Sequence, residues 1–89
     1  MLNQNEDYSY QSISASTLIK TGSGQFGGIF CSSVTGGTVT FYDNTTASNP
    51  TIVASFTPAA STPYPFPCRF STGLYIAITG TVSLTVFFN

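Results

Sequence analysis

The sequence predicts an all-β fold: an antiparallel β-sandwich of about seven short strands, of jelly-roll or Ig-like type. From Ile13 onward, β-branched and aromatic residues alternate with Ser and Thr, which is the period of a strand with one buried face. Gly or Pro interrupts these runs every few residues, as turns between short strands require. No stretch repeats apolar residues at helical spacing. The pattern fits a two-sheet sandwich better than a closed barrel.

The alternation places the strands at 13–20, 26–34, 38–43, 51–56, 68–71, 74–79 and 81–88. The side chains expected on their inward faces are Val39, Phe41, Ile52, Ala54, Phe56, Leu74, Ile76, Ile78, Val82, Leu84, Val86 and Phe88. Gly36 and Gly37 are expected to form a two-residue hairpin turn between the second and third strands. Gly80 is expected to turn the last two strands in the same way.

Three segments are expected to lie outside the strands. Residues 1–12 are polar and show no sustained period, so they are predicted to be a flexible N-terminal arm, which leaves 13–89 as one domain. Residues 44–50 form a polar loop. Residues 57–67 (TPAASTPYPFP) hold four prolines and are predicted to be a stiff crossover outside the sheet, because proline cannot donate to a ladder.

The charge inventory excludes most catalytic chemistry. Between Tyr8 and Asn89 the only formal charges are Lys20, Asp43 and Arg69, and the chain has no His and no Trp. Paired carboxylates, His bases and metal-ligating clusters cannot be assembled from this set, so we expect no enzyme activity, no catalytic residue, no metal and no cofactor. Two basic residues are also too few to form the positively charged surface that binds nucleic acid, so no nucleic-acid partner is expected.

The N-terminal residues and the cysteines are informative about the cellular compartment of the protein. The first dozen residues have neither the basic start nor the apolar core of a secretory signal, and no apolar run is long enough for a membrane span. We therefore expect synthesis in the cytoplasm and no membrane partner. Cys31 and Cys68 are expected to be free core thiols, although they could pair if their strands face each other across the core.

Six side chains are candidates for a partner interface. Tyr8, Tyr10, Tyr64 and Phe66 lie in the arm and the proline segment, where burial within one subunit is not forced. They either fold back on their own sheet edges or insert into a partner, and both alternatives stay open. Asp43 and Arg69 are expected to form a solvent-exposed ion pair at a strand end or a contact with a neighbouring subunit. A chain this poor in charge is expected to self-associate.

Two stretches resemble small virion proteins of tailed bacteriophages, especially capsid decoration or cement proteins. They are GIFCSSVTGGTVTFYDN at 28–44 and PFPCRFSTGLYIAITGTVSLTVFF at 65–88. The shared order is a Gly-rich hairpin, a T-V-T-x-Y-D strand, a Pro-bearing crossover and a G-L-Y-x-x-x-T-G hairpin. The resemblance implies a β-sandwich, usually a homotrimer, bound to the major capsid protein on the outside of an icosahedral head.

The expected function is therefore that of a non-enzymatic structural protein, made in the host cytoplasm and located on the capsid exterior of the virion. Two alternatives remain. One is a head-fibre, tail or baseplate module, because similar modules occur in phage tail and fibre proteins. The other is a glycan-binding β-sandwich in which exposed Tyr and Phe stack on sugars, although the absence of Trp and the scarcity of Asp, Glu, Asn and Arg argue against it.

Overall fold

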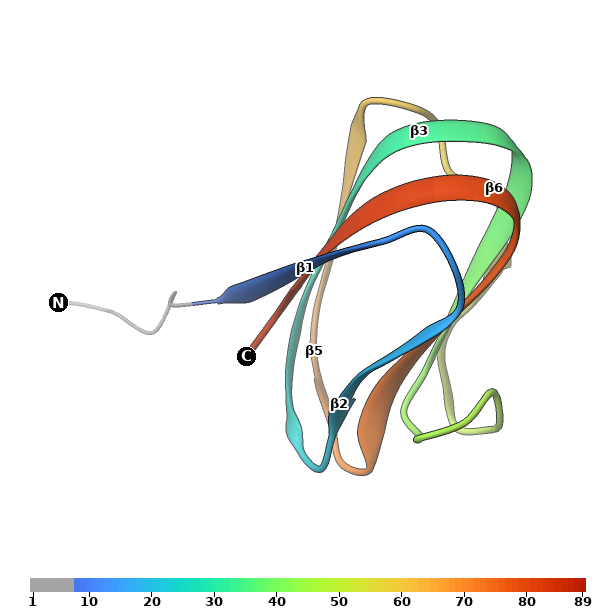
Figure 1. Ribbon diagram of the computed structural model, residues 1–89. Coiled ribbons are helices and arrows are strands. Elements are labelled where there is room, and N and C mark those ends of the chain that lie inside the picture. The colour runs from blue at the N-terminus through green and yellow to red at the C-terminus, as the bar shows by residue number, and fades with distance from the viewer. Residues whose placement is uncertain (1–7) are drawn as a thin grey trace, which may run out of the picture.

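The structure is a computed structural model, and it describes residues 8–89. The described chain is all-β and antiparallel, which confirms the predicted fold class (Figure 1). It contains six strands: β1 (Ser9–Ile13), β2 (Thr17–Thr21), β3 (Gly24–Tyr42), β4 (Thr51–Phe56), β5 (Thr62–Phe70) and β6 (Gly73–Phe88).

β3 and β6 organise the fold, because each is long enough to belong to two layers. The N-terminal half of β3 pairs with β5 and with the C-terminal half of β6, whose other neighbour is β1. The C-terminal half of β3 pairs with β4 and with the N-terminal half of β6, whose other neighbour is β2. We call these two groups layer 1 and layer 2. One continuous sheet thus folds over on itself and resembles a sandwich (Figure 1).

The two glycine turns expected from the sequence are not hairpins, and that prediction was wrong. Gly37 and Gly80 are paired neighbours in the middle of continuous strands, at the place where β3 and β6 bend from layer 1 into layer 2. Gly36 and Gly80 have φ values of +63° and +74°. A hairpin turn and a bulge at a sheet corner both favour glycine, because both require positive φ. The presence of glycine therefore could not show which of the two structures forms here.

The proline segment also differs from expectation, because residues 62–70 form strand β5 at the edge of layer 1. Pro63, Pro65 and Pro67 occupy alternate positions, so their missing N–H groups lie along one side of the strand. The other side remains able to pair with β3. Proline is therefore tolerated here for the reason that it is tolerated on edge strands generally.

The N-terminal region is more ordered than the sequence suggested. Ser9–Ile13 pairs with β6, so the predicted arm boundary at residue 12 is wrong, while residues 1–7 lie outside the described residues. The expected strand at 13–20 is interrupted at 14–16 and divides between β1 and β2, which join different layers. Ser16 stabilises this crossing, because its Oγ accepts a 2.8 Å hydrogen bond from the Ile78 N–H.

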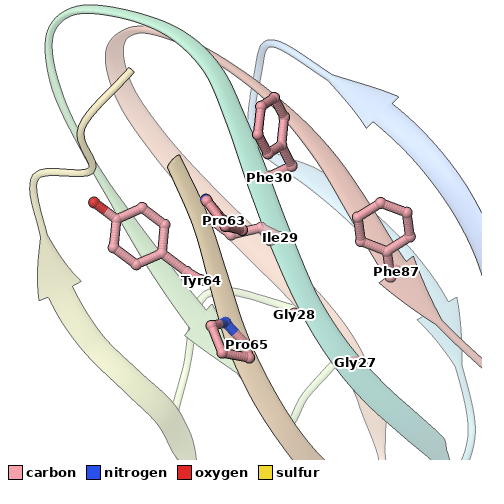
Figure 2. Close-up of a pocket in the computed structure, with 8 residues that line it drawn as sticks. All are labelled: Gly27, Gly28, Ile29, Phe30, Pro63, Tyr64, Pro65 and Phe87. Atoms are coloured by element: carbon pink, nitrogen blue, oxygen red, sulfur yellow. The ribbon is translucent and has the colours of Figure 1, made fainter. Parts of the chain in front are cut away.

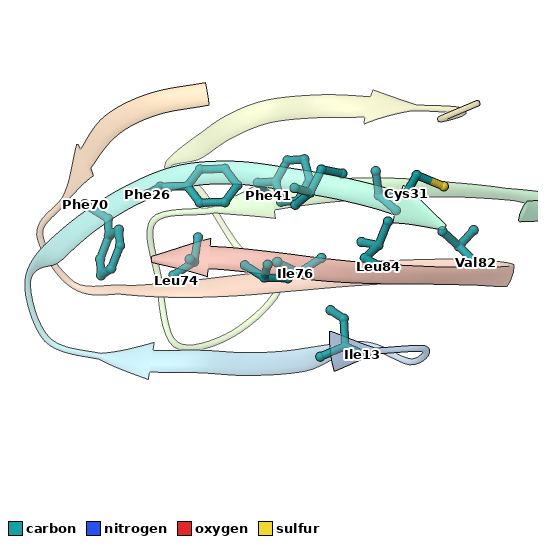
Figure 3. Close-up of a cluster of buried hydrophobic side chains, with 12 residues drawn as sticks. Ile13, Phe26, Cys31, Phe41, Phe70, Leu74, Ile76, Val82 and Leu84 are labelled. Atoms are coloured by element: carbon teal, nitrogen blue, oxygen red, sulfur yellow. The ribbon is translucent and has the colours of Figure 1, made fainter. Parts of the chain in front are cut away.

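The core lies between the two layers and is apolar. Phe26 of layer 1 packs against Phe41 of layer 2 with ring centroids 5.2 Å apart. Most side chains predicted to be inward are buried or packed on this core, whereas Ala54 is exposed, because the register of β4 shifts against β3. The buried hydrophobic side chains that form this core cluster are Ile13, Phe26, Ile29, Cys31, Val39, Phe41, Phe70, Leu74, Ile76, Val82, Leu84 and Val86 (Figure 3).

Candidate binding groove

A groove on the outer face of layer 1 is built by residues that lie side by side across four strands. The register aligns Tyr10 of β1, Phe87 of β6, Gly28 of β3 and Pro65 of β5 in one row. Directly opposed residues in a sheet point to the same face, so this row faces outward as a unit. Two residues further along β3, Phe30 also faces outward.

Gly28 lines the groove and lets β3 and β5 approach each other closely there. A Cβ atom at Gly28 would collide with the Tyr64 carbonyl oxygen and lie 2.9 Å from the Pro65 Cα, and its φ of +129° favours glycine. An open hollow of about 450 Å³ lies between the aromatic side and the proline side of this surface. Its lining residues are Gly27, Gly28, Ile29, Phe30, Pro63, Tyr64, Pro65 and Phe87 (Figure 2).

The groove walls are apolar and accessible. Phe30 and Phe87 are each 37% exposed, and no charged side chain lines the hollow. Tyr8 borders the groove, because its ring atoms would lie 3.1 Å from a Cβ placed on Gly27. An exposed aromatic and proline surface of this kind is typical of a site that binds another molecule.

Tyr8 and Tyr10 remain candidates for a partner interface. Tyr8 is 37% exposed, and Tyr10 is 74% exposed, the largest value among the exposed large apolar side chains of the described residues. Both lie on the β1 side of the groove. The structure leaves both rings free to contact a partner, and their role there stays a prediction.

Tyr64 and Phe66 pack within the chain's own fold, which is one of the two alternatives that the sequence left open, and a contact of either ring with a partner stays a prediction. The Tyr64 ring packs edge-on against Phe56 at 5.3 Å, and its hydroxyl accepts a 2.8 Å hydrogen bond from the Ala59 N–H. Phe66 packs against Phe41 at 5.6 Å. Figure 2 shows the Tyr64 ring directed away from Phe30 and Phe87. They turn inward because they alternate with outward-facing prolines along a strand.

Asp43 and Arg69 do not pair with each other in the part of the chain that the structure describes. The Asp43 carboxylate accepts hydrogen bonds from the backbone N–H groups of Ser71 (2.9 Å), Thr72 (2.8 Å) and Gly73 (3.4 Å). Desolvation raises the pKa of Asp43, the hydrogen bonds from these three N–H groups lower it, and the net result is a pKa below its ordinary value. Asp43 therefore holds the β5–β6 turn, while Arg69 is exposed on β5.

The cysteines are free thiols, Cys31 buried in the core and Cys68 half-buried. Desolvation by burial is the largest effect on Cys31 and raises the pKa of its thiol, against a smaller lowering effect of the Ser33 backbone. Desolvation and the nearby Asp43 charge both raise the pKa of Cys68. Both thiols are therefore protonated and poorly nucleophilic near neutral pH.

Residues 8–89 contain neither a metal-binding cluster nor a membrane-spanning helix. They contain no group of three or more His, Cys, Asp or Glu side chains placed to hold a metal ion. They also contain no helix with the length and apolarity that a membrane crossing requires.

Sequence reasoning missed the groove, although a signal for it exists. Ile29–Phe30 and Phe87–Phe88 are apolar doublets within strands, and adjacent residues of a strand face opposite sides. One member of each doublet must therefore face outward. Since Ile29 is buried and Phe88 packs on the core, Phe30 and Phe87 are the exposed members.

Comparison with protein-family models, curated proteins and solved structures finds no match to this chain. The resemblance to capsid decoration proteins rests on the stretches at 28–44 and 65–88. The groove is an independent physical observation, because Phe87 and Phe30 face outward whatever the chain's relatives are.

Proposed function

We propose that this chain is a non-enzymatic virion structural protein that binds the outer surface of a phage capsid as an oligomer, with the groove of layer 1 as its contact surface. The observation that carries the proposal is the uncharged row of Tyr10, Phe87, Gly28 and Pro65 across four strands, in which every residue but Gly28 is exposed. The resemblance of the sequence to decoration proteins supplies the capsid as partner.

The groove suits a protein partner of low charge. Aromatic side chains in the centre of an interface supply most of its binding energy, because they bury a large apolar area with few rotatable bonds. Gly28 and Pro65, which follow Phe87 in the row, lose little conformational entropy on binding. Contact strength would therefore depend on shape and apolar area, with little dependence on salt.

The mechanism proposed is mechanical and multivalent. A single groove makes a modest contact, but an oligomer presents several grooves to a repeating lattice at once. Each contact after the first is effectively intramolecular, so total affinity rises steeply without any new kind of contact. Separating two capsid subunits bridged in this way requires several contacts to break together, which would stabilise the shell against heat and internal pressure.

The test compares capsid occupancy of Phe87→Ser, Phe30→Ser and Leu18→Ser, using capsids assembled without this protein. Phe87 and Phe30 lie at the groove, whereas Leu18 is on β2 in layer 2 and is equally exposed at 39%. We expect either groove substitution to weaken binding at least about 30-fold, because a central aromatic contact contributes about 2 kcal/mol or more. Leu18→Ser should bind like the wild type.

The three variants should lose similar amounts of thermal stability, because the replaced side chains are exposed to similar extents, 37% to 39%. Equal binding by all four proteins would contradict the groove as the contact surface. Absence of wild-type binding to any capsid would contradict the capsid as partner. Electron microscopy of purified virions tests the head-fibre, tail or baseplate alternative, since it places the protein's density on the shell or on the tail.

The glycan-binding alternative has one supporting observation, the exposed Tyr10 ring beside Phe87. Sugar recognition also needs carboxylate, amide or guanidinium groups that hydrogen-bond hydroxyls, and the groove lining contains none. A glycan array on which the wild type binds, and Tyr10→Ala does not, would favour this alternative over the capsid.

A further inference from the structure

The open edges of the sheet point to a self-association site. In the described residues, β1, β2, β4 and β5 each have a single strand neighbour, so each presents unpaired N–H and C=O groups on its other side. Such edges pair readily with another strand, and proteins usually block them with proline, charge or irregular geometry. An edge that lacks every one of these devices is the place where pairing is expected.

Three of the four edges carry such a device. β5 has Pro63, Pro65 and Pro67 at alternate positions, together with a register shift against β3. β2 carries Lys20 and a register shift beside it. β4 is irregular, with two register shifts along its short pairing with β3.

β1 carries none of them. Its five residues, Ser9–Ile13, contain no proline and no charged residue, and they pair with β6 in an unbroken register. Its first four residues are exposed and only Ile13 is buried. The edge is therefore regular, uncharged and open.

We propose that β1 pairs antiparallel with β1 of a second copy of this chain, about a two-fold axis that passes through Gln11. The inference deepens the proposed function and rests on it in one respect, that the chain acts as an oligomer. An interface of this kind uses the same surface on both subunits, so it needs one open edge and no second complementary site.

The register about Gln11 gives Tyr10 a partner. With Gln11 opposite its own counterpart, Tyr10 faces Ser12 of the partner subunit, and the two Tyr10 rings become diagonal neighbours on one face. Diagonal residues of an antiparallel pair are about 7 to 8 Å apart at the backbone, within reach of aromatic side chains. Each ring, 74% exposed in the single chain, would then be covered by the other.

Charge and continuity favour a second copy as the occupant. No ionised side chain lies in β1, so no like charges oppose each other within the paired strands, and the chain as a whole carries a formal charge of only -1. Pairing through β1 joins layer 1 of both copies into one sheet, which places the two grooves on the same face. A pair built in this way presents two grooves to one surface, as the multivalent mechanism requires.

The test is the solution mass by light scattering over about a hundredfold range of concentration. We expect the wild type to approach twice its chain mass of 9.4 kDa at high concentration. Gln11→Lys places two like charges directly opposite each other and should raise the dimer Kd at least about tenfold. The matched control is Ser55→Lys, also at an exposed position but on the β4 edge, which should dimerise like the wild type.

A charge-swap mixture tests the two-fold axis itself. Gln11→Glu alone should also impair dimerisation, whereas an equimolar mixture of Gln11→Lys and Gln11→Glu should form a mixed dimer, because opposite charges then meet at the axis. This rescue also shows that both variants are folded. A monomeric wild type, a wild-type trimer, a dimer unaffected by Gln11→Lys, or a mixture that stays monomeric would overturn the inference.

The outcomes separate this inference from the proposed function. A dimer that follows the Gln11 pattern but binds no capsid contradicts the function and leaves β1 pairing intact. Capsid binding by a wild type whose mass is trimeric, or by a chain that stays monomeric, supports the function and contradicts β1 pairing.

Discussion

Asp43 fixes the turn between β5 and β6 by accepting hydrogen bonds from three consecutive backbone N–H groups, those of Ser71, Thr72 and Gly73. Hydrogen bonds to an ionised acceptor are stronger than neutral ones. We predict that Asp43→Asn costs about 1 to 2 kcal/mol at neutral pH, a discounted value because the carboxylate is partly solvated. Thermal unfolding should show a Tm lowered by about 4 to 8 °C per kcal/mol.

The pH dependence of this effect follows from the lowered pKa of Asp43. A carboxyl whose folded-state pKa lies below its unfolded value stabilises the fold fully above the unfolded value of about 4. That contribution disappears as the pH falls through the folded-state value. The Tm difference between wild type and Asp43→Asn should therefore be largest near pH 7 and shrink below about pH 4. A difference that stays constant down to strongly acidic pH would contradict the role given to the carboxylate.

The sequence predicted correctly whether a side chain faces the core or the solvent wherever strand alternation alone determines this. Val82, Leu84 and Val86 are buried as expected, and the same alternation makes Phe87 exposed. Tyr64 could not be assigned in this way, because its segment reads as a proline-rich connection until β3 is known to lie beside it. Tertiary pairing decides the position of that residue, and pairing is a property of the fold as a whole.

At the scale of the element, the glycines at the bend determine how closely β3 and β6 approach. A Cβ added at Gly80 would meet the Gly36 carbonyl oxygen and lie 2.7 Å from the Gly37 Cα, whereas a Cβ added at Gly36 has nothing within 4 Å. Both residues have positive φ, so a side chain at either one carries a similar backbone strain. The pair therefore separates the effect of strain from the effect of strand contact.

We predict that Gly36→Ala costs about 1 kcal/mol and that Gly80→Ala costs at least about 2 kcal/mol more. Strain alone acts at the first position, whereas at the second the two backbones must also move apart. Denaturant unfolding of the two variants measures the difference. Equal losses of stability would show that the bend does not depend on close contact between the strands.

The element boundaries were the least predictable feature. Each run of alternating residues is visible in the sequence, but nothing local shows that Gly36 continues one strand while residues 22–23 end another. Positive φ occurs at Gly22 as well as at Gly36 and Gly80, so both turns and bends contain the same residue type. A glycine lies at a bend within a strand, and not at a turn, when the segment that follows it continues to pair with the same neighbouring strand.

At the scale of the whole molecule, the all-β class was predictable because period-2 alternation, frequent turn residues and the absence of a helical pattern agree with one another. The layered arrangement follows from two long strands that no local signal reveals. The groove depends both on the residues of each strand and on how the strands pair, since Gly28 and Phe87 become neighbours only after β3 and β6 have paired. A binding surface formed in this way is encoded in the register of the sheet.

The sharing of β3 and β6 predicts that the two layers unfold as one unit. Ile29 of layer 1 and Ile76 of layer 2 are both buried, so Ile29→Val and Ile76→Val remove the same group from opposite layers. Each should cost about 1 kcal/mol. Because β3 and β6 run through both layers, neither layer can open while the other keeps its central strands, so either substitution should lower amide-exchange protection equally in β2 and β5. Protection lost only in the substituted layer would show that the bend at Gly37 and Gly80 acts as a hinge between two independently stable halves.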